Sequence, residues 1–425
     1  MATAARVAAP SLINMASTIP VHDLRVGMFV HLDLGWMQHP FALSSFRLQS
    51  AEQIETIRGL GLSQVRWDPA HSAVDEPPEV PPAAAPESPA EAARHQRRAT
   101  LAAHRRQTAL LERECDEAGQ ALRDATRGAM VEPARACTDA EALAGKLIQR
   151  LAVEGEICIR LVNSQAGDRA AAHGLNVAVM ALLMGRALHL DDEAMLELGL
   201  GALLHDMGKL ELPDRVRHLD ESFGPAEIQA YREHVVHGMT LGRRMGLRTG
   251  ALAVLGQHHE HADGSGFPLR LAADRISLAA RIVCIVDRYD NLCNPAQMAH
   301  ALTPHEAVSL LFTQHRERYD AALLINFIRM VGVYPAGSVV QLTDERFALV
   351  MAVNSSRPLK PRVIVHDPKV PPDEALLLDL ERVPQLGIRR SLPAARLPPA
   401  ARAYLAPRPR VAYFFEPAPP PPAGP

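Results

Sequence analysis

The sequence predicts a mainly α-helical fold: a helical bundle preceded by a small α+β domain and followed by a short β module. Two observations support this fold class. Between residues 135 and 335, apolar residues recur at helical spacing in one segment after another, whereas residues 18–75 and 336–416 hold short strand-like runs separated by turn residues. A chain of 425 residues, of which 48% are hydrophobic, is also long enough for two to three domains with a sizeable core.

The N-terminal α+β domain is expected over residues 18–75, where short strand-like runs such as Met28 to Leu32 alternate with one helix over Ser50 to Leu60. Glycine follows twice within three residues, at Gly59 and Gly61, and ends this helix. Short strands around a single helix predict a compact module of its own.

Residues 76–134 are expected to form a linker followed by a long helix. The segment from Glu76 to Pro89 consists of Pro, Ala and Glu in near alternation, which cannot build a core and favours an extended linker. Residues 91–130 have the Arg, Gln, Ala, Leu and Glu content of an exposed helix, with sparse apolar positions. We expect this helix to be solvated, with a homodimer contact through it as the alternative.

The helical bundle is expected over residues 135–335, and between Asp139 and Gly332 the pattern predicts helices alone. Pro225 stands near the start of the helix that carries His234, at a place compatible with the first helical position. Side chains from several helices therefore converge on one bundle interior, which is the arrangement that helical bundles use for metal centres.

The C-terminal β module is expected over residues 336–416. Its strands are predicted at Ser338 to Leu342, at Phe347 to Met351 and at Arg362 to Val365, where β-branched and aromatic residues cluster. Residues 417–425 are nearly all Pro and Ala and should be disordered.

Composition gives no reason to expect nucleic acid or membrane partners. The formal net charge of -3 does not favour DNA, RNA or an anionic membrane. The longest apolar stretch, Leu175 to Leu190, is interrupted by Arg186 and His189 and is too short to span a bilayer. The N-terminus lacks the apolar region of a secretory signal. The five cysteines form no CxxC pair, so we expect reduced thiols and a cytoplasmic protein.

Seven residues of metal-binding type stand in or beside apolar helical segments. Imidazoles together with carboxylates suit divalent first-row metals, and seven of them exceed what one ion needs. A single histidine at such a place is more often an ordinary core or surface residue. The doublet of His205 and Asp206 differs, because burying both unpaired at the end of an apolar run would cost roughly several kcal/mol. The sequence predicts a two-metal centre built from His173, His205, Asp206, His234, His258, His259 and Asp287.

These motifs resemble those of the HD-GYP proteins, the branch of the HD phosphohydrolase superfamily that hydrolyses cyclic di-GMP. The matching motifs include His-Asp-x-Gly-Lys at His205 to Lys209 and the dense segment His258 to Pro268. The resemblance covers roughly residues 135–335 and implies an HD-type helical bundle there. In addition, the segment from Val21 to Pro69 resembles the small domain that often precedes HD-GYP domains in bacteria.

The resemblance implies a cyclic di-GMP phosphodiesterase that linearises the dinucleotide to pGpG, with GMP as a possible later product. It implies that Asp206 bridges two ions and that Lys209 steadies negative charge as the diester is cleaved. Nitrogen and oxygen ligands without thiolates suit Fe or Mn, which the family commonly uses, and do not exclude Zn. The resemblance assigns His173, His205 and Asp287 to one ion, and His234, His258 and His259 to the other.

The segment Gly264 to Pro268 predicts a tight loop, because two glycines and a proline favour unusual backbone dihedrals. Loop structure alone would explain these residues. The resemblance implies further that Gly264, Gly266, Phe267 and Pro268 shape the site and meet a GGDEF-type diguanylate cyclase. Phe267 replaces the tyrosine that gives the GYP motif its name.

Two departures from the family bear on metal number and on activity. Arg169 stands four residues before His173, where members with a third metal carry glutamate; a cation cannot ligate, so two metals are expected. After Asp290, the usual stretch rich in Arg and Tyr, which holds substrate phosphate, reads Asn291 to Ala296. The absence of its cations weakens phosphate binding, because each charge-assisted hydrogen bond is worth roughly 1.5–3 kcal/mol.

Two functions of different class therefore remain open. The complete ligand set and Lys209 favour an active phosphodiesterase. The missing basic stretch favours a catalytically weak or inactive regulatory module that binds cyclic di-GMP or a GGDEF-type cyclase. A hydrolase for another nucleotide, such as a dNTP or an alarmone, is disfavoured by the segment His258 to Pro268.

Overall fold

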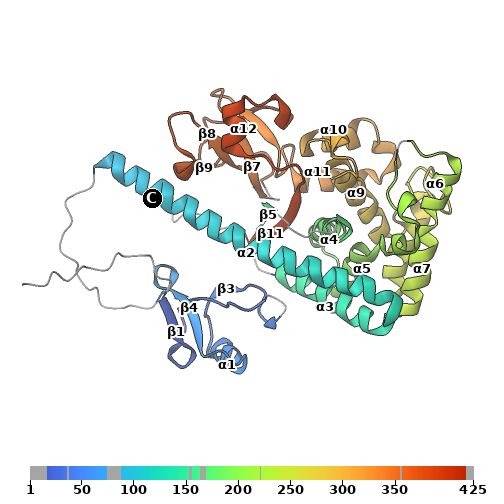
Figure 1. Ribbon diagram of the computed structural model, residues 1–425, viewed down its shortest axis with the longest axis horizontal. Helices are drawn as coiled ribbons and strands as arrows, with labels where there is room; N and C mark the ends of the chain where they lie inside the picture. The colour runs from blue at the N-terminus through green and yellow to red at the C-terminus, as the bar shows by residue number, and fades with distance from the viewer. Residues whose placement is uncertain are drawn as a thin grey trace, which may run out of the picture. The chain divides into compact units, whose positions relative to one another are not determined.

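The computed structural model describes residues 17–35, 38–73, 88–152, 156–162, 169–220, 222–354 and 357–417. It contains two compact units, Met1–Ala85 and Pro86–Pro425, and each is described by itself (Figure 1). The predicted fold class is confirmed: the chain is mainly helical, with a small mixed unit near the N-terminus and an antiparallel sheet near the C-terminus. Most of the linker expected from Glu76 to Pro89, and the tail after Pro417, lie outside the described residues.

The first unit is a four-stranded antiparallel sheet with one α-helix. Helix α1 (Ala51–Gly59) begins where Ser50 Oγ accepts a hydrogen bond from the backbone N–H of Gln53, which satisfies one of the free N–H groups of the first turn. The helix and the strand-like run predicted for this unit are confirmed. In spatial order the strands are β1 (Ser17–Pro20), β4 (Gln64–Asp68), β2 (Phe29–His31) and β3 (Ser45–Arg47).

The second unit combines the C-terminal sheet with a helical bundle built around α4 (Arg169–Ala187), which is buried along most of its length. Helices α5 (Asp192–Leu204) and α9 (Leu278–Cys293) pack against α4, which Figure 1 shows end-on within the bundle. The other helices are α2 (Pro89–Val131), α3 (Pro133–Leu151), α6 (Pro225–Arg232), α7 (His234–Met245), α8 (Thr249–Gln257), α10 (Pro304–Thr313), α11 (Ala321–Val331) and α12 (Pro399–Leu405). By length and composition α4 could cross a membrane, but 72% of its most apolar window is buried in the fold, as in the core helix of a soluble protein.

Helix α2 differs from the solvated helix expected over residues 91–130. Its first turns are exposed, but from Leu101 onward one face is buried against the bundle, and Leu122 is only 2% exposed. A buried ion pair between Glu114 and Arg150 joins α2 to α3. The expectation of an exposed helix is therefore wrong beyond the first turns. Its apolar residues are sparse because they cover a single stripe.

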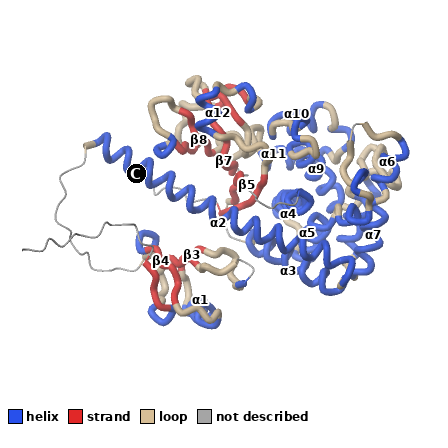
Figure 2. Tube along the Cα trace, in the orientation of Figure 1, coloured by secondary structure: helices blue, strands red, loops and turns tan. Residues whose placement is uncertain are grey.

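The C-terminal sheet takes one of its seven strands from the middle of the chain. Strand β5 (Ile157–Val162) lies between β7 and β11, with Arg160 opposite both Ala352 and Phe414. The expectation of helices alone between Asp139 and Gly332 is therefore wrong at β5, because a short apolar run becomes a strand where a sheet pairs both of its edges. The remaining strands are β6 (Val339–Leu342), β7 (Phe347–Asn354), β8 (Arg362–His366), β9 (Leu376–Asp379), β10 (Ile388–Ser391) and β11 (Ala412–Pro417). Figure 2 shows strands in red and labels β5, β7 and β8 of this sheet.

Strand β11 and the residue before it fasten this sheet to α4 and α9. Asn176 of α4 donates a hydrogen bond to Val411 O at 3.1 Å and accepts one from the backbone N–H of Tyr413 at 3.0 Å. Asn294, which follows α9, donates to Val411 O at 2.8 Å and accepts from the N–H of Val411 at 2.9 Å. The end of the described chain therefore fixes the two helices on which His173 and Asp287 lie.

Candidate metal centre

The seven candidate ligands come together in the bundle from five places in the chain. His173 lies on α4, His205 and Asp206 follow α5, His234 begins α7, His258 and His259 follow α8, and Asp287 lies on α9. Their nitrogens face one another: His205 Nε2 lies 3.2 Å from His173 Nε2, and His234 Nε2 lies 3.4 Å from His258 Nε2. The structure thus brings together every side chain that the sequence singled out as a ligand.

His234 begins a helix of its own, which the sequence did not predict. Helix α6 ends at Arg232 and α7 begins two residues later, so Pro225 is the first residue of α6 and the single helix expected from the sequence is wrong. No proline or glycine marks the break, so the pattern reads as continuous. The turn after Asp206 packs tightly against α7: a Cβ added to Gly208 would lie 1.9 Å from His234 O, so only glycine fits there.

Asp206 lies between two groups of histidines. Its Oδ2 is 3.6 Å from both His173 Nε2 and His205 Nε2. Its Oδ1 is 3.7 Å from His234 Nε2 and 3.9 Å from His258 Nε2. Each of two sets, Asp206 with His173 and His205, and Asp206 with His234, His258 and His259, offers ligand atoms that all lie within 4.8 Å of one another. These groups could hold metal ions, and Asp206 is common to both.

The donor atoms fit metal ions. Asp206 Oδ1 and His259 Nε2 are buried and have no hydrogen-bond partner within the described part of the chain. His205, His234 and His258 each place Nδ1 beside the backbone carbonyl three residues earlier, at 2.8, 2.6 and 3.0 Å. When Nδ1 donates to that carbonyl, a neutral ring keeps a free lone pair on Nε2, which points toward the other ligands. Histidines that bind metals are usually held in this way.

A second layer of polar groups orients His173 and Asp287. His173 Nδ1 lies 2.6 Å from Asp290 Oδ2, and Asp290 Oδ1 accepts a hydrogen bond from Asn176 at 2.8 Å. Asn291 donates to Asp287 Oδ1 at 2.7 Å. Contacts of this kind fix the tautomer and the ring orientation of a ligand. The sequence offered one signal for Asp290, its spacing of three residues from Asp287 on one helical face.

Burial and neighbouring charges set the protonation of the histidines. Burial, with His205 and His234 adding to it, lowers the pKa of His258 to about 3. Burial also lowers the pKa of His234 to about 4, against the opposing effect of Asp206. For His173, burial would lower the pKa, but hydrogen bonds with Asp287 and Asp290 raise it to about 10. A metal ion on His173 therefore has to displace a proton.

We expect the metal-free protein to lose stability when it is acidified below pH 6.5. A histidine in an unfolded chain has a pKa of about 6.5, whereas in the folded protein the pKa is about 4 for His234 and about 3 for His258. Their contribution is fully present above pH 6.5 and is lost toward pH 4 and 3, because the unfolded chain binds protons that the fold excludes. His173 acts in the opposite sense: its contribution is fully present below pH 6.5 and is lost progressively as the pH rises from 6.5 to about 10.

Thermal unfolding of chelator-treated protein between pH 6.5 and 4.5 tests this expectation. The melting temperature should fall with pH, and His258→Asn should make the fall less steep because it removes one of the two groups. A melting temperature that rises on acidification, or a slope unaffected by the substitution, would contradict it.

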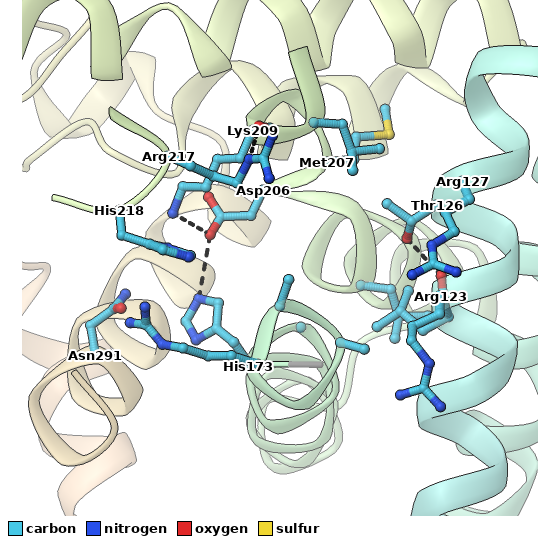
Figure 3. Close-up of a pocket in the computed structure, with 17 residues that line it drawn as sticks. Arg123, Thr126, Arg127, His173, Asp206, Met207, Lys209, Arg217, His218 and Asn291 are labelled. Atoms are coloured by element: carbon cyan, nitrogen blue, oxygen red, sulfur yellow. Dashed lines mark hydrogen bonds and ion pairs between the residues drawn. The ribbon is translucent and has the colours of Figure 1, made fainter. Parts of the chain in front are cut away.

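A cavity of about 820 Å³, including its open mouth, adjoins Asp206 (Figure 3). Lys209 lines the cavity and donates a hydrogen bond from Nζ to Asp206 Oδ2 at 2.6 Å. Burial alone would lower the pKa of Lys209, but the charge of Asp206 raises it, so the ammonium group keeps its charge. Arg169 and Arg217 line the same cavity.

The loop after His259 is held by Glu260. The carboxylate of Glu260, which is 1% exposed, accepts hydrogen bonds from the backbone N–H groups of Leu269 at 2.6 Å and Leu271 at 2.8 Å. Phe267 stacks on His259, with ring centroids 4.6 Å apart. The loop therefore supports the His258 and His259 side of the centre. The described residues that line the cavity at Lys209 do not include Gly264, Gly266, Phe267 or Pro268, whose contact with substrate remains a prediction.

Known proteins resemble both the N-terminal part of this chain and its helical bundle. A family model described as an HD domain matches residues 134–323, and one described as a domain of unknown function, DUF3391, matches residues 17–153. Cyclic di-GMP phosphodiesterase PA4108 of Pseudomonas aeruginosa is 30% identical over 367 residues, which cover 83% of this chain and 85% of that protein. This chain belongs to the HD-GYP family. The family resemblance of its motifs is thereby confirmed.

Further relatives match parts of this HD-GYP protein. Cyclic di-GMP phosphodiesterase response regulator RpfG of Xanthomonas campestris is 33% identical over 144 residues, which cover 33% of this chain and 38% of that protein. Among solved structures, Bd1817, a HDG"Y"P protein from Bdellovibrio bacteriovorus, matches with a TM-score of 0.42 and 15% identity, covering 73% of this chain and 97% of that one.

In this HD-GYP protein we expect Glu260→Ala to weaken both the fold and metal binding. The substitution leaves the backbone N–H groups of Leu269 and Leu271 without an acceptor, at a cost of about 1–3 kcal/mol for the buried one at Leu271. It also releases the loop behind His258 and His259, which should lower metal affinity roughly 10- to 100-fold. Denaturant unfolding and metal titration measure the two effects. Glu317→Ala, at an exposed position, is the control. Unchanged metal affinity in a destabilised Glu260→Ala protein would refute the positioning role.

Proposed function

We propose that this HD-GYP protein is a cytoplasmic, metal-dependent phosphodiesterase that hydrolyses cyclic di-GMP to pGpG, with GMP as a possible later product. The observation that carries the proposal is the placement of Asp206 between two groups of histidines, at the edge of a cavity that Lys209 also lines. Membership in the HD-GYP family, and relatives named as cyclic di-GMP phosphodiesterases, support this dinucleotide as the substrate.

Two divalent transition-metal ions are the proposed cofactor. Such a pair, when bound, supplies an activated water and accepts the charge of a phosphoryl oxygen. Nitrogen and oxygen donors suit Fe or Mn, with Zn as the alternative. Arg169 supports two ions and not three, because its guanidinium lines the cavity together with His173 and cannot be a ligand. One ion would be held by His173, His205 and Asp287, the other by His234, His258 and His259, with Asp206 shared.

Lys209 is proposed to act on the scissile phosphodiester. Its Nζ lies beside Asp206 Oδ2, the carboxylate oxygen that faces His173 and His205. A phosphodiester at the metal centre would place an oxygen close to this ammonium group. The charge of Lys209 would then oppose the negative charge that develops as the P–O bond breaks.

Other cations of the cavity can replace the basic stretch that is missing after Asp290. Arg169 and Arg217 line the cavity together with Lys209. Arg217 donates to the carbonyl oxygens of Lys209 and Leu212, both at 3.1 Å, and forms an ion pair with Asp214 at 2.7 Å. Because a charge-assisted hydrogen bond is worth roughly 1.5–3 kcal/mol, Arg169 can restore part of the phosphate binding that Asn291 to Ala296 cannot provide.

The second candidate is a regulatory module that binds cyclic di-GMP or a GGDEF-type cyclase with little turnover. The absence of any cation from Asn291 to Ala296 favours it. In addition, Leu269, which follows the loop Gly264 to Pro268, is 70% exposed, as a contact with a partner protein would require. The cations of the cavity favour the enzyme.

Anaerobically purified protein, incubated with cyclic di-GMP and followed by chromatography, separates the two candidates. For the enzyme we expect about two transition-metal ions per chain, and formation of pGpG that stops when the metal is stripped. A metal content near one or near three would contradict the two-metal centre. Binding of the dinucleotide without turnover above a metal-stripped control would favour the regulatory module.

A further inference from the structure

The cavity beside the metal centre reaches helix α2, which lies far from the HD motif in the sequence. Arg123 and Arg127 line the same cavity as Asp206 and Lys209. Figure 3 shows the two arginines on α2 at one side of the cavity, with Asp206 and Lys209 on the other side. Helix α2 falls within the residues 17–153 that match the domain of unknown function.

These two arginines carry charge that the described part of the protein does not neutralise. They stand four residues apart on one helical face, where like charges repel. Neither forms an ion pair with a carboxylate of the described residues. Arg123 donates from Nη2 to Gln120 Oε1 at 2.6 Å, whereas its Nη1 is buried without a hydrogen-bond partner among those residues. Buried guanidinium nitrogens normally donate a hydrogen bond. A bound ligand can supply the acceptor that Nη1 of Arg123 lacks.

Apolar side chains line the same cavity. Leu122 of α2, Leu203 of α5, and Met207 and Leu210 of the turn after Asp206 all line the cavity. The cavity therefore has one charged side at Lys209, a second charged side on α2, and an apolar lining. A cyclic dinucleotide presents matching chemistry, since a phosphodiester is joined through ribose to a flat base whose outer edge is polar.

We infer that Arg123 and Arg127 bind the outer edge of one guanine base of the dinucleotide while a phosphodiester lies at the metal centre. Guanine presents two acceptors on this edge, O6 and N7, and an arginine fork matches both. Adenine places an amino group where guanine has O6, and this donor repels a guanidinium. The inference rests on the proposed function and assigns to the end of α2 the selection of guanine over adenine.

Binding measurements on the full-length chain test this assignment. Calorimetry on the metal-loaded protein, with phosphorothioate analogues that resist turnover, compares cyclic di-GMP with cyclic di-AMP. We expect Arg123→Gln and Arg127→Gln each to weaken binding of cyclic di-GMP by roughly 10-fold, and the double variant by up to roughly 100-fold, since a bidentate contact discriminates between bases by such factors. Binding of cyclic di-AMP should change less than about twofold. Arg127→Lys, which keeps the charge and loses the fork, should resemble Arg127→Gln.

Arg106→Gln, at an exposed position of α2 that does not line the cavity, is the matched control and should leave binding of both dinucleotides unchanged. If the substitutions weakened binding of cyclic di-GMP and cyclic di-AMP equally, the inference would be overturned, because the loss of charge alone would explain the result. Unchanged binding of cyclic di-GMP in the double variant would also overturn it. If the parent protein hydrolyses cyclic di-GMP and the variants bind it with the same affinity as the parent, only this inference is overturned. A parent that neither binds nor hydrolyses it would overturn the proposed function as well.

Discussion

Asp206→Ala should remove most of both metal ions and reduce turnover of cyclic di-GMP to the level of metal-stripped protein. The two carboxylate oxygens of Asp206 face different groups of histidines, at 3.6 Å on one side and 3.7 Å on the other. Because one side chain serves both groups, its removal should affect both. Elemental analysis of anaerobically prepared protein, with the chromatographic assay beside it, measures both effects.

Asp274→Ala, which removes an exposed carboxylate, is the control for this experiment and should keep both ions. Retention of one full ion by Asp206→Ala would show that the two groups are independent and that Asp206 belongs to one of them only.

Lys209→Ala should keep both metal ions and lower turnover by one to three orders of magnitude. Lys209 is not one of the proposed ligands, but its Nζ lies 2.6 Å from Asp206 Oδ2 and its side chain lines the cavity. Removing one preorganised group that stabilises developing charge typically costs a factor of about 10 to 1,000 in rate. Steady-state kinetics with metal analysis on the same preparation checks the prediction.

His258→Ala provides the contrast, because a ligand substitution should lose metal and activity together. If the protein is a regulatory module, the parent shows no turnover above the metal-stripped control, while dinucleotide or cyclase binding persists in both variants. Slow hydrolysis by the parent that neither substitution alters would come from a contaminant and would remove the support for an enzyme.

The sequence could predict the candidate site because its residues stand in short motifs within strongly helical segments. His205 and Asp206 end an apolar run, and His258 and His259 follow another, so their convergence on one bundle interior follows from the pattern. The sequence shows that Glu260 follows His259, but it does not show what the Glu260 carboxylate binds. Its partners are backbone N–H groups of the loop, and only the folded loop shows that both carboxylate oxygens are used.

The sequence alone could not predict which distant segments pair with one another. Strand β5 is a short apolar run whose partners, β7 and β11, come about 200 residues or more later, so nothing near it distinguishes a strand from a buried helix. The buried face of α2 was missed for a related reason. A single stripe of apolar residues on a long charged helix looks solvated until α3 is known to cover it.

The hydrogen bonds of Val411 with Asn176 and Asn294 have a consequence for the order of synthesis. A ribosome completes His173, Asp206 and Asp287 long before it adds Val411, and until then α4 and α9 lack the strand that fastens them. Chains fold progressively from the N-terminus as they are made. A nascent chain, or one shortened by a stop codon before Val411, would therefore carry every candidate ligand without the strand that fastens α4 and α9 to each other.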